Sequence, residues 1–137
     1  MTLKLQLVRD GKVISEIPLS PDDWTRTELE NELDSVEEDF NRFSKIFNAF
    51  AHETRLKMMS RLMEEEDYTV SFADFMRDLH LNPKLVWENT RRLREGGLVE
   101  KTGRGQYSCS EFGQRTFMMM NLALRHMLDA LEELEEL

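Results

Sequence analysis

The sequence predicts a mainly α-helical protein with a small amount of β structure. Three patterns support this prediction: a strongly capped helix at residues 83–95, two short β-rich runs that follow it around a glycine turn, and an apolar stripe of helical spacing on each side of this central part. Together they indicate one globular core that is bracketed by two long amphipathic helices.

The helix at residues 83–95 has clear signals at its start. Asn82 is a suitable N-cap, and Pro83 occupies the first helical position, where its missing N–H costs no hydrogen bond. Small or apolar residues recur from Val86 to Leu93 at spacings of four and three, so they share one face. One side of this helix is therefore expected to pack and the other to face outward.

A small β-hairpin is predicted directly after this helix. Gly96-Gly97 ends the helix, because glycine accepts the left-handed conformation that a helix C-terminus needs. Residues 98–102 and 106–110 then read as two strands joined by the tight turn Gly103-Arg104-Gly105. The β-rich residues 68–70 are expected to add a third strand beside this hairpin.

Two further helices are predicted ahead of residue 83. Ser71 is a suitable N-cap for a short helix with an apolar face, and residues 80–82 form a turn of the length that joins two crossed helices into a helix-turn-helix. An earlier helix spans residues 53–63. The expected inward residues of that helix are Leu56, Met59, Leu62 and Met63, and the expected outward residues are Arg55, Lys57 and Arg61.

At this point the sequence resembles the ArsR-type winged-helix regulators. The resemblance rests on Ala51-His52-Glu53-Thr54-Arg55-Leu56, on the helix at 83–95 and on Leu93-Arg94-Glu95-Gly96-Gly97-Leu98-Val99, and it covers residues 46–113. It implies a winged helix-turn-helix fold and a dimeric, DNA-binding transcriptional regulator. It is specific for the fold and much less specific for a ligand or a DNA target.

The N-terminal residues predict a separate β-hairpin. Asp10-Gly11 lies between two β-rich apolar runs, which is a strong hairpin signal. An isolated hairpin is marginally stable in water, so its leucine-rich face needs another element or another subunit. The predicted organisation is a hairpin at 1–20 and a single winged-helix domain at 21–137, which comprises a dimerisation helix at about 21–50, the winged helix-turn-helix at 51–110 and a C-terminal dimerisation helix at 111–137.

The two flanking helices carry long apolar stripes. From Leu29 to Phe50, and again from Phe117 to Leu134, apolar residues recur at spacings that alternate between three and four. A core of about sixty residues cannot cover both stripes along their length. We therefore predict a homodimer, as the resemblance also implies. The expected interface residues are Leu33, Val36, Phe40, Phe43, Leu124, Met127, Leu131 and Leu134.

The charge distribution favours DNA binding in only one part of the chain. The net charge of −9 has the wrong sign for a protein that approaches phosphates. Residues 79–115, however, contain seven basic and four acidic residues, which gives +3 there and leaves −12 for the rest. The basic part coincides with the helix at 83–95 and the hairpin after it. An alternative is an acidic winged-helix module that binds protein through its acidic surface or its N-terminal hairpin, without specific DNA binding.

The outward face of the helix at 83–95 is the predicted recognition surface for double-stranded DNA. In the major groove, Arg91 could reach a phosphate or a guanine edge. Related regulators commonly have a neutral or basic residue at the position of Glu88. Its carboxylate could accept a hydrogen bond from a cytosine amino group. The alternative is a solvated face on which Lys84 pairs with Glu88, and Glu88 with Arg91 or Arg92. The expected DNA contacts are Lys84, Trp87, Glu88, Arg91, Arg92, Lys101 and Arg104.

Other function classes find little support. The sequence offers no paired base and nucleophile and no phosphate-binding glycine loop, so we expect no enzyme, no cofactor and no metal. A His126/Asp129 zinc pair is a minor alternative. Cys109, the single cysteine, is expected to be a small buried hydrophobe. No run of eighteen apolar residues and no signal-peptide pattern is present, so a cytoplasmic location without membrane contact is expected.

Overall fold

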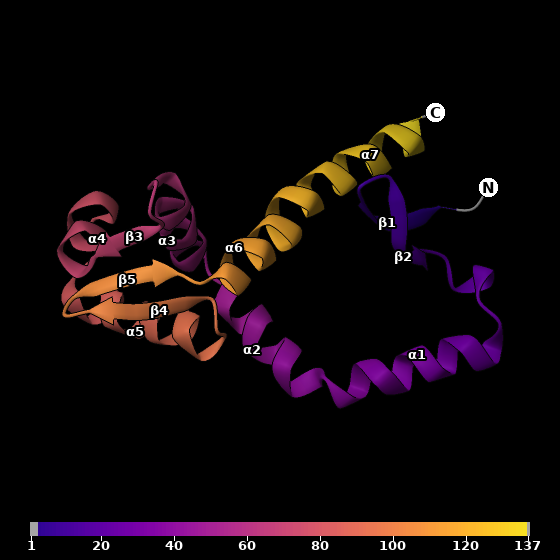
Figure 1. The fold of residues 1–137 in the computed structure, drawn as a ribbon, viewed down its shortest axis with the longest axis horizontal. Helices are drawn as coiled ribbons and strands as arrows, with labels where there is room; N and C mark the ends of the chain where they lie inside the picture. The colour runs from indigo at the N-terminus through magenta and orange to yellow at the C-terminus, as the bar shows by residue number, and fades with distance from the viewer. Residues whose placement is uncertain (1–2, 137) are drawn as a thin grey trace. The chain divides into compact units, whose positions relative to one another are not determined.

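The structure is a computed structural model that describes residues 3–136. In this part of the chain, five short strands form two antiparallel sheets and the remainder is mostly helical (Figure 1). The predicted fold class, mainly α with small β elements, is confirmed. The chain divides into two compact units, residues 1–41 and residues 42–137, which are described one after the other.

The first unit begins with the predicted hairpin. Strands β1 (Lys4–Arg9) and β2 (Lys12–Pro18) pair in antiparallel fashion around a two-residue turn. Asp10 and Gly11 both have positive φ, of 49° and 80°, as a type I′ turn requires. The hairpin is confirmed, and its apolar side chains are exposed in the single chain.

The single helix predicted at about 21–50 is broken into separate elements. Asp39 leaves the helical conformation with φ −99° and ψ 4°. Three consecutive acidic residues, 37–39, lie at this point, where aspartate is a poor helix former and negative charge opposes the helix dipole. The elements are a 3-10 turn (Pro21–Asp23), α1 (Arg26–Glu38) and α2 (Phe40–Phe50). Residue 20, the predicted end of the hairpin segment, lies within the first unit.

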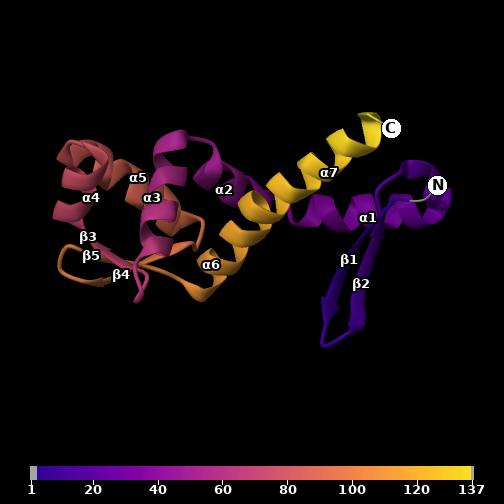
Figure 2. The ribbon, with the colours of Figure 1, turned by 90° about the horizontal axis from the view of Figure 1, so that it is seen from above.

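The second unit contains the winged-helix core. A three-stranded antiparallel sheet in the order β3-β5-β4 packs with α3, α4 and α5 (Figure 2). The third strand predicted beside the hairpin is confirmed, because β3 pairs with β5. The elements are α3 (Glu53–Glu64), β3 (Thr69–Ser71), α4 (Phe72–Leu79), α5 (Pro83–Glu95), β4 (Val99–Gly103), β5 (Gln106–Cys109), α6 (Glu111–Phe117), a π-helical segment (Met118–Ala123) and α7 (Leu124–Glu136).

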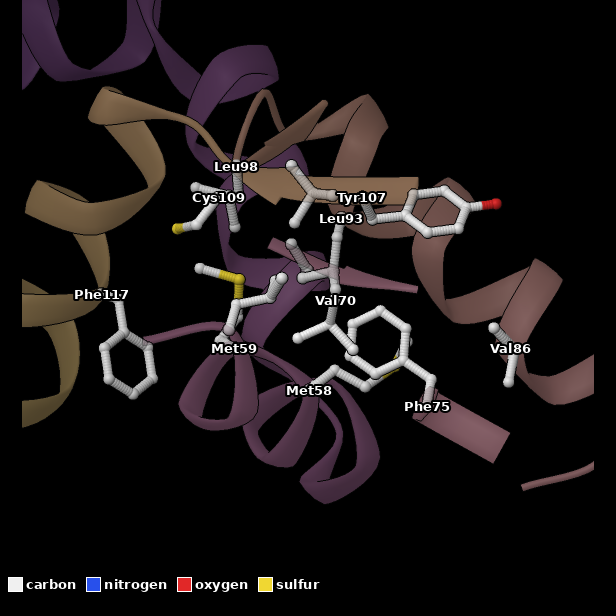
Figure 3. Packing of buried hydrophobic residues seen from close by; sticks show 13 residues of the cluster. Met58, Met59, Val70, Phe75, Val86, Leu93, Leu98, Tyr107, Cys109 and Phe117 are labelled. Carbon is white, nitrogen blue, oxygen red and sulfur yellow. The ribbon is translucent and has the colours of Figure 1, made fainter. Parts of the chain in front are cut away.

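The core is a single cluster of side chains from these helices and strands (Figure 3). Met58, Met59 and Phe75 are fully buried at its centre. Leu56, predicted to point inward, is only half-buried, and Met58 takes the inward position that the sequence had not assigned. Cys109 is buried as predicted, and this burial raises the pKa of its thiol to about 11.

The predicted C-terminal helix is observed with one irregularity. The backbone keeps right-handed helical angles at Phe117 and Leu124, on either side of the π-helical segment. Within residues 124–135 of α7, all side chains are exposed except that of Met127, which is partly buried. The last predicted position, residue 137, lies outside the described residues.

Gly113 fixes how closely α6 approaches the core. Its backbone N–H donates to the Ser110 hydroxyl, which caps α6, over 2.8 Å. A Cβ at this position would overlap the backbone carbonyl of Leu98. We therefore expect Gly113→Ala to lower the free energy of unfolding by about 3 kcal/mol in a denaturant titration, because a backbone group cannot move aside as a side chain can.

Gly103→Ala is the matched control for this substitution. A Cβ at Gly103 meets only the Gln106 side chain at 3.8 Å, which is an ordinary contact. This variant should change the free energy of unfolding by less than about 0.5 kcal/mol. Equal stabilities for the two variants would show that α6 is not held against Leu98 in this way.

Candidate nucleic-acid interface

Helix α5 is set in place by the signals that the sequence displays. Asn82 Oδ1 accepts from the Leu85 N–H over 2.9 Å, and Gly97 adopts a φ of 75° after the last turn. Val86 and Leu93 are completely buried on its inner face. The predicted inner and outer faces of this helix are therefore confirmed.

The turn before α5 is tight and completes a helix-turn-helix. The Ser71 hydroxyl accepts from the Asp74 N–H over 3.0 Å and caps α4, as predicted. At the other end of α4, His80 takes a left-handed conformation with φ 55°. The Leu81 N–H then donates back to the Met76 carbonyl over 3.1 Å, which lets α5 begin within three residues.

The sequence prediction is wrong for Arg55. It was expected on the outer face of α3, but its side chain is only 6% exposed. Its guanidinium donates to the backbone carbonyls of Ala49 and Asn48, over 3.0 and 2.7 Å, and to Asn89 Oδ1 over 3.0 Å. Asn89 in turn donates to the Leu85 carbonyl over 2.8 Å. Arg55 thus joins the end of α2 to the middle of α5.

Arg55 forms no ion pair in the described part of the chain. Burial lowers the pKa of Arg55, and the nearby positive charge of Arg92 lowers it further. The last carbonyls of α2 offset this cost, because the C-terminus of a helix carries partial negative charge. The buried cation therefore depends on the exact end of α2.

The predicted ion pairs on the outer face of α5 form only in part. Lys84 lies 4.0 Å from Glu88, as the solvated-face alternative expects. Arg91 and Arg92, however, pair with Glu95, over 3.8 and 3.2 Å, and not with Glu88. Exposed pairs of this kind are worth less than about 1 kcal/mol, so they can be exchanged for phosphate contacts at little cost.

Trp87 is exposed on this face. Its side chain is 55% exposed, so it is not half-buried against a neighbouring helix. The guanidinium of Arg91 lies 5.0 Å from the centre of its ring, within the range of a cation–π contact. Arg91 therefore has two neighbours on this face, the indole ring of Trp87 and the carboxylate of Glu95.

A hollow of about 510 Å³ lies between α5 and β4. It brings Arg91 of the helix together with Lys101 of the wing, two of the predicted contacts. Arg94 also lines it, although the sequence prediction did not include this residue. Its signal was available, since Arg94 is three positions after Arg91 on the same helix. The lining residues are Arg91, Arg94, Glu95, Val99, Glu100 and Lys101.

A second hollow, of about 490 Å³, lies on the other side of Arg91. It contains the predicted residues Glu88 and Arg92, with Arg55 and Asn89 also in its wall. His52 and Thr54, at the start of α3, complete its rim and were not predicted. The lining residues are Asn48, His52, Thr54, Arg55, Leu85, Glu88, Asn89, Arg91 and Arg92.

Three predicted residues lie outside both hollows: Trp87, Lys84 and Arg104. Lys84 is exposed in the first turn of α5, and Arg104 is exposed in the two-residue turn of the wing. Among residues 3–136, Arg104, Arg94 and Lys101 form no ion pair with the protein, so these three charges are available to an external anion. The other three exposed cations of this surface, Lys84, Arg91 and Arg92, each have a carboxylate within 4.0 Å.

Other kinds of site are poorly supported in the same part of the chain. Among the described residues, no group of three or more His, Cys, Asp or Glu side chains is arranged to hold a metal ion. No helix among them is long and apolar enough to cross a lipid bilayer.

The fold and this surface together define a winged helix-turn-helix protein. No protein-family model matches the chain, and no curated protein sequence matches it. Solved structures do resemble it. A possible transcriptional regulatory protein from Mycobacterium bovis (residues 1–100) aligns with a TM-score of 0.54 and 21% identity, over 63% of this chain and 94% of that one.

Two further structures give the same result. A MarR family transcriptional regulator from Streptomyces coelicolor aligns with a TM-score of 0.53 and 12% identity, over 80% of this chain and 82% of that one. The transcriptional repressor BigR from Xylella fastidiosa aligns with a TM-score of 0.50 and 18% identity, over 65% and 89%. At these identities the likeness establishes the winged-helix fold and does not single out the ArsR type.

Arg55 is open to a direct test. Arg55→Met keeps most of the side-chain volume but removes three hydrogen bonds, so we expect the free energy of unfolding to fall by about 3 kcal/mol. Arg55→Lys should not restore it, because one ammonium group cannot reproduce the planar fork of donors. Urea titration with circular dichroism measures both.

Lys57→Met serves as the control, since Lys57 lies two residues away on α3 and is exposed. It should change stability by less than about 0.5 kcal/mol. A stable Arg55→Met variant would mean that the link between α2 and α5 contributes nothing to the fold.

Proposed function

We propose that this protein is a dimeric transcriptional regulator that binds double-stranded DNA. In this proposal α5 enters the major groove and the wing turn at 103–105 lies on the flanking backbone. The observation that carries the proposal is the outer surface of α5 and the wing, where basic side chains gather in a protein whose net charge is −9. The solved structures with this fold are themselves named as transcriptional regulators, which supports it.

The contacts divide into two kinds in this proposal. Lys84, Arg92, Lys101 and Arg104 would bind phosphates and position the protein, and Arg94 joins them. Arg91, supported by Trp87, would reach a base edge, and Glu88 would accept from a cytosine amino group beside it. Affinity would come mainly from phosphates and would fall steeply with salt concentration.

Two copies would read a pseudo-palindromic site. Half-sites are then about one helical turn, roughly 34–36 Å, apart. The exposed stripe on α7 and the apolar residues of α1 and α2 supply surface for such a dimer. The proposed contact residues are Leu33, Val36, Phe40, Phe43, Leu124, Met127, Leu131 and Leu134.

DNA binding is tested by fluorescence anisotropy with duplex from the region upstream of the protein's own gene and with unrelated duplex. We expect tighter binding to the upstream duplex and a linear fall of log K with log salt. Arg104→Ala and Lys84→Ala should each lower the slope of that plot by about 1, because each removes a phosphate contact. Arg91→Ala should in addition reduce the preference for the upstream duplex.

Lys12→Ala is the matched control for charge. Lys12 is exposed in the hairpin turn region and, among residues 3–136, forms no ion pair. It should leave both affinity and slope unchanged. Wild-type binding by Arg91→Ala and Lys84→Ala would overturn this docking. The absence of binding to either duplex at low salt would instead favour the protein-binding alternative, whose surfaces are the hairpin and the acidic residues 22–39.

Dimer formation is tested by sedimentation velocity over a range of protein concentrations. Leu131→Glu places a charge within the exposed stripe of α7 and should raise the dimer dissociation constant about a hundredfold. His126→Glu adds the same charge away from this stripe and should change little. A wild-type protein that stays monomeric, or a Leu131→Glu variant that dimerises normally, would contradict the interface.

A further inference from the structure

An apolar hollow in the second unit has no role in the DNA surface. It has a volume of about 390 Å³, within the size range of small-molecule sites in proteins. One wall comes from α2, and the other comes from α6 and the π-helical segment. The lining residues are Arg42, Phe43, Ile46, Phe47, Phe112, Thr116, Met119 and Met120.

The walls of this hollow favour an aromatic guest. Phe43 and Phe47 lie with ring centres 6.4 Å apart and tilted by 39°, which leaves ring faces and edges for further stacking. Met119 and Met120 reach the hollow from the π-helical segment, an irregularity that occurs often at functional sites. Thioethers adapt to the shape of a guest and make favourable contacts with aromatic rings.

The same hollow carries one charge, and it is positive. The guanidinium of Arg42 lies 5.6 Å from the centre of the Phe112 ring. Among the described residues Arg42 forms no ion pair, and the lining contains no aspartate or glutamate. In an acidic protein, an apolar hollow whose only charged lining residue is an arginine favours a guest that combines a ring with an anion.

A buried hydroxyl in the wall adds a second polar feature. Thr116 is 3% exposed, and its Oγ1 is the only buried side-chain oxygen or nitrogen among the described residues that has no hydrogen-bond partner. Such a group costs free energy until it is paired. An oxygen of a bound guest would provide the missing partner.

We propose that this hollow binds a small aromatic carboxylic acid of one or two fused rings. The ring lies among Phe43, Phe47 and the two methionines, and the carboxylate meets Arg42 and the Thr116 hydroxyl. This site goes beyond DNA binding and shares no residue with the α5 and wing surface. It shares one residue, Phe43, with the proposed dimer contacts.

The experiment uses the full chain and 2-naphthoate as the probe, with ligand-observed NMR and isothermal titration calorimetry. Binding with a dissociation constant below about 1 mM is expected, and the neutral analogue 2-naphthamide should bind about tenfold more weakly. Arg42→Gln should remove most of the difference between the two compounds.

Thr116→Val tests the hydroxyl separately. It should weaken 2-naphthoate severalfold without lowering the melting temperature, because the hydroxyl it removes has no partner in the protein. Lys45→Gln, an exposed charge change on α2 outside the hollow, should leave binding unchanged.

Three results would overturn the proposal. One is the absence of 2-naphthoate binding up to about 1 mM. Another is equal binding of the acid by wild type, Arg42→Gln and Thr116→Val. A third is binding that weakens as protein concentration rises, since a second copy of the chain would then occupy the hollow. DNA affinity measured without the acid remains a separate result, so the ligand site and the DNA surface fail independently.

Discussion

The second unit depends on one buried cation. Arg55 lies among α2, α3 and α5 and forms no ion pair in the described residues. Carbonyls at the end of α2 and the side chain of Asn89 accept its hydrogen bonds. Removing an ion from water costs several kcal/mol, so this arrangement is stable only if every donor finds its partner. The end of α2 and the axis of α5 are therefore fixed together. A change at either helix would leave a buried charge unpaired.

The position of α5 decides what its outer face can do. On the inner face, Val86 and Leu93 pack in the core, and Asn89 accepts a hydrogen bond from Arg55. The basic side chains of α5 therefore lie on the opposite, outer face. The overall charge of −9 matters less than this local arrangement. At physiological salt, charges more than about 8 Å apart in solvent are largely screened, so a phosphate at α5 responds mainly to the side chains beside it.

Local signals in the sequence were sufficient to predict much of the structure of this unit. Capping at Ser71 and Asn82 and the left-handed glycine at position 97 depend on neighbouring residues only, and all were predicted. The burial of Arg55 was not predicted. A helical pattern assigns a charged residue to the solvent face, and the hydrogen-bond partner Asn89 is 34 positions away in the sequence, beyond the reach of a local signal. The break at Asp39 was missed because the apolar spacing continues across it. Arg94 was overlooked, although its spacing from Arg91 placed it near the same surface.

The flanking helices follow a different physical rule from the core. Met58, Phe75 and Leu98 bury their side chains within one chain, whereas Leu124 and Leu131 of α7 remain exposed in it. Apolar stripes of that length on an isolated helix are unfavourable in water, and two copies that share them would remove this cost. In the proposed dimer, the core then fixes how α5 meets one half-site and the flanking helices fix the distance to the next. Affinity for a half-site and spacing between half-sites would thus reside in different parts of the chain, so that a substitution could alter one and leave the other intact.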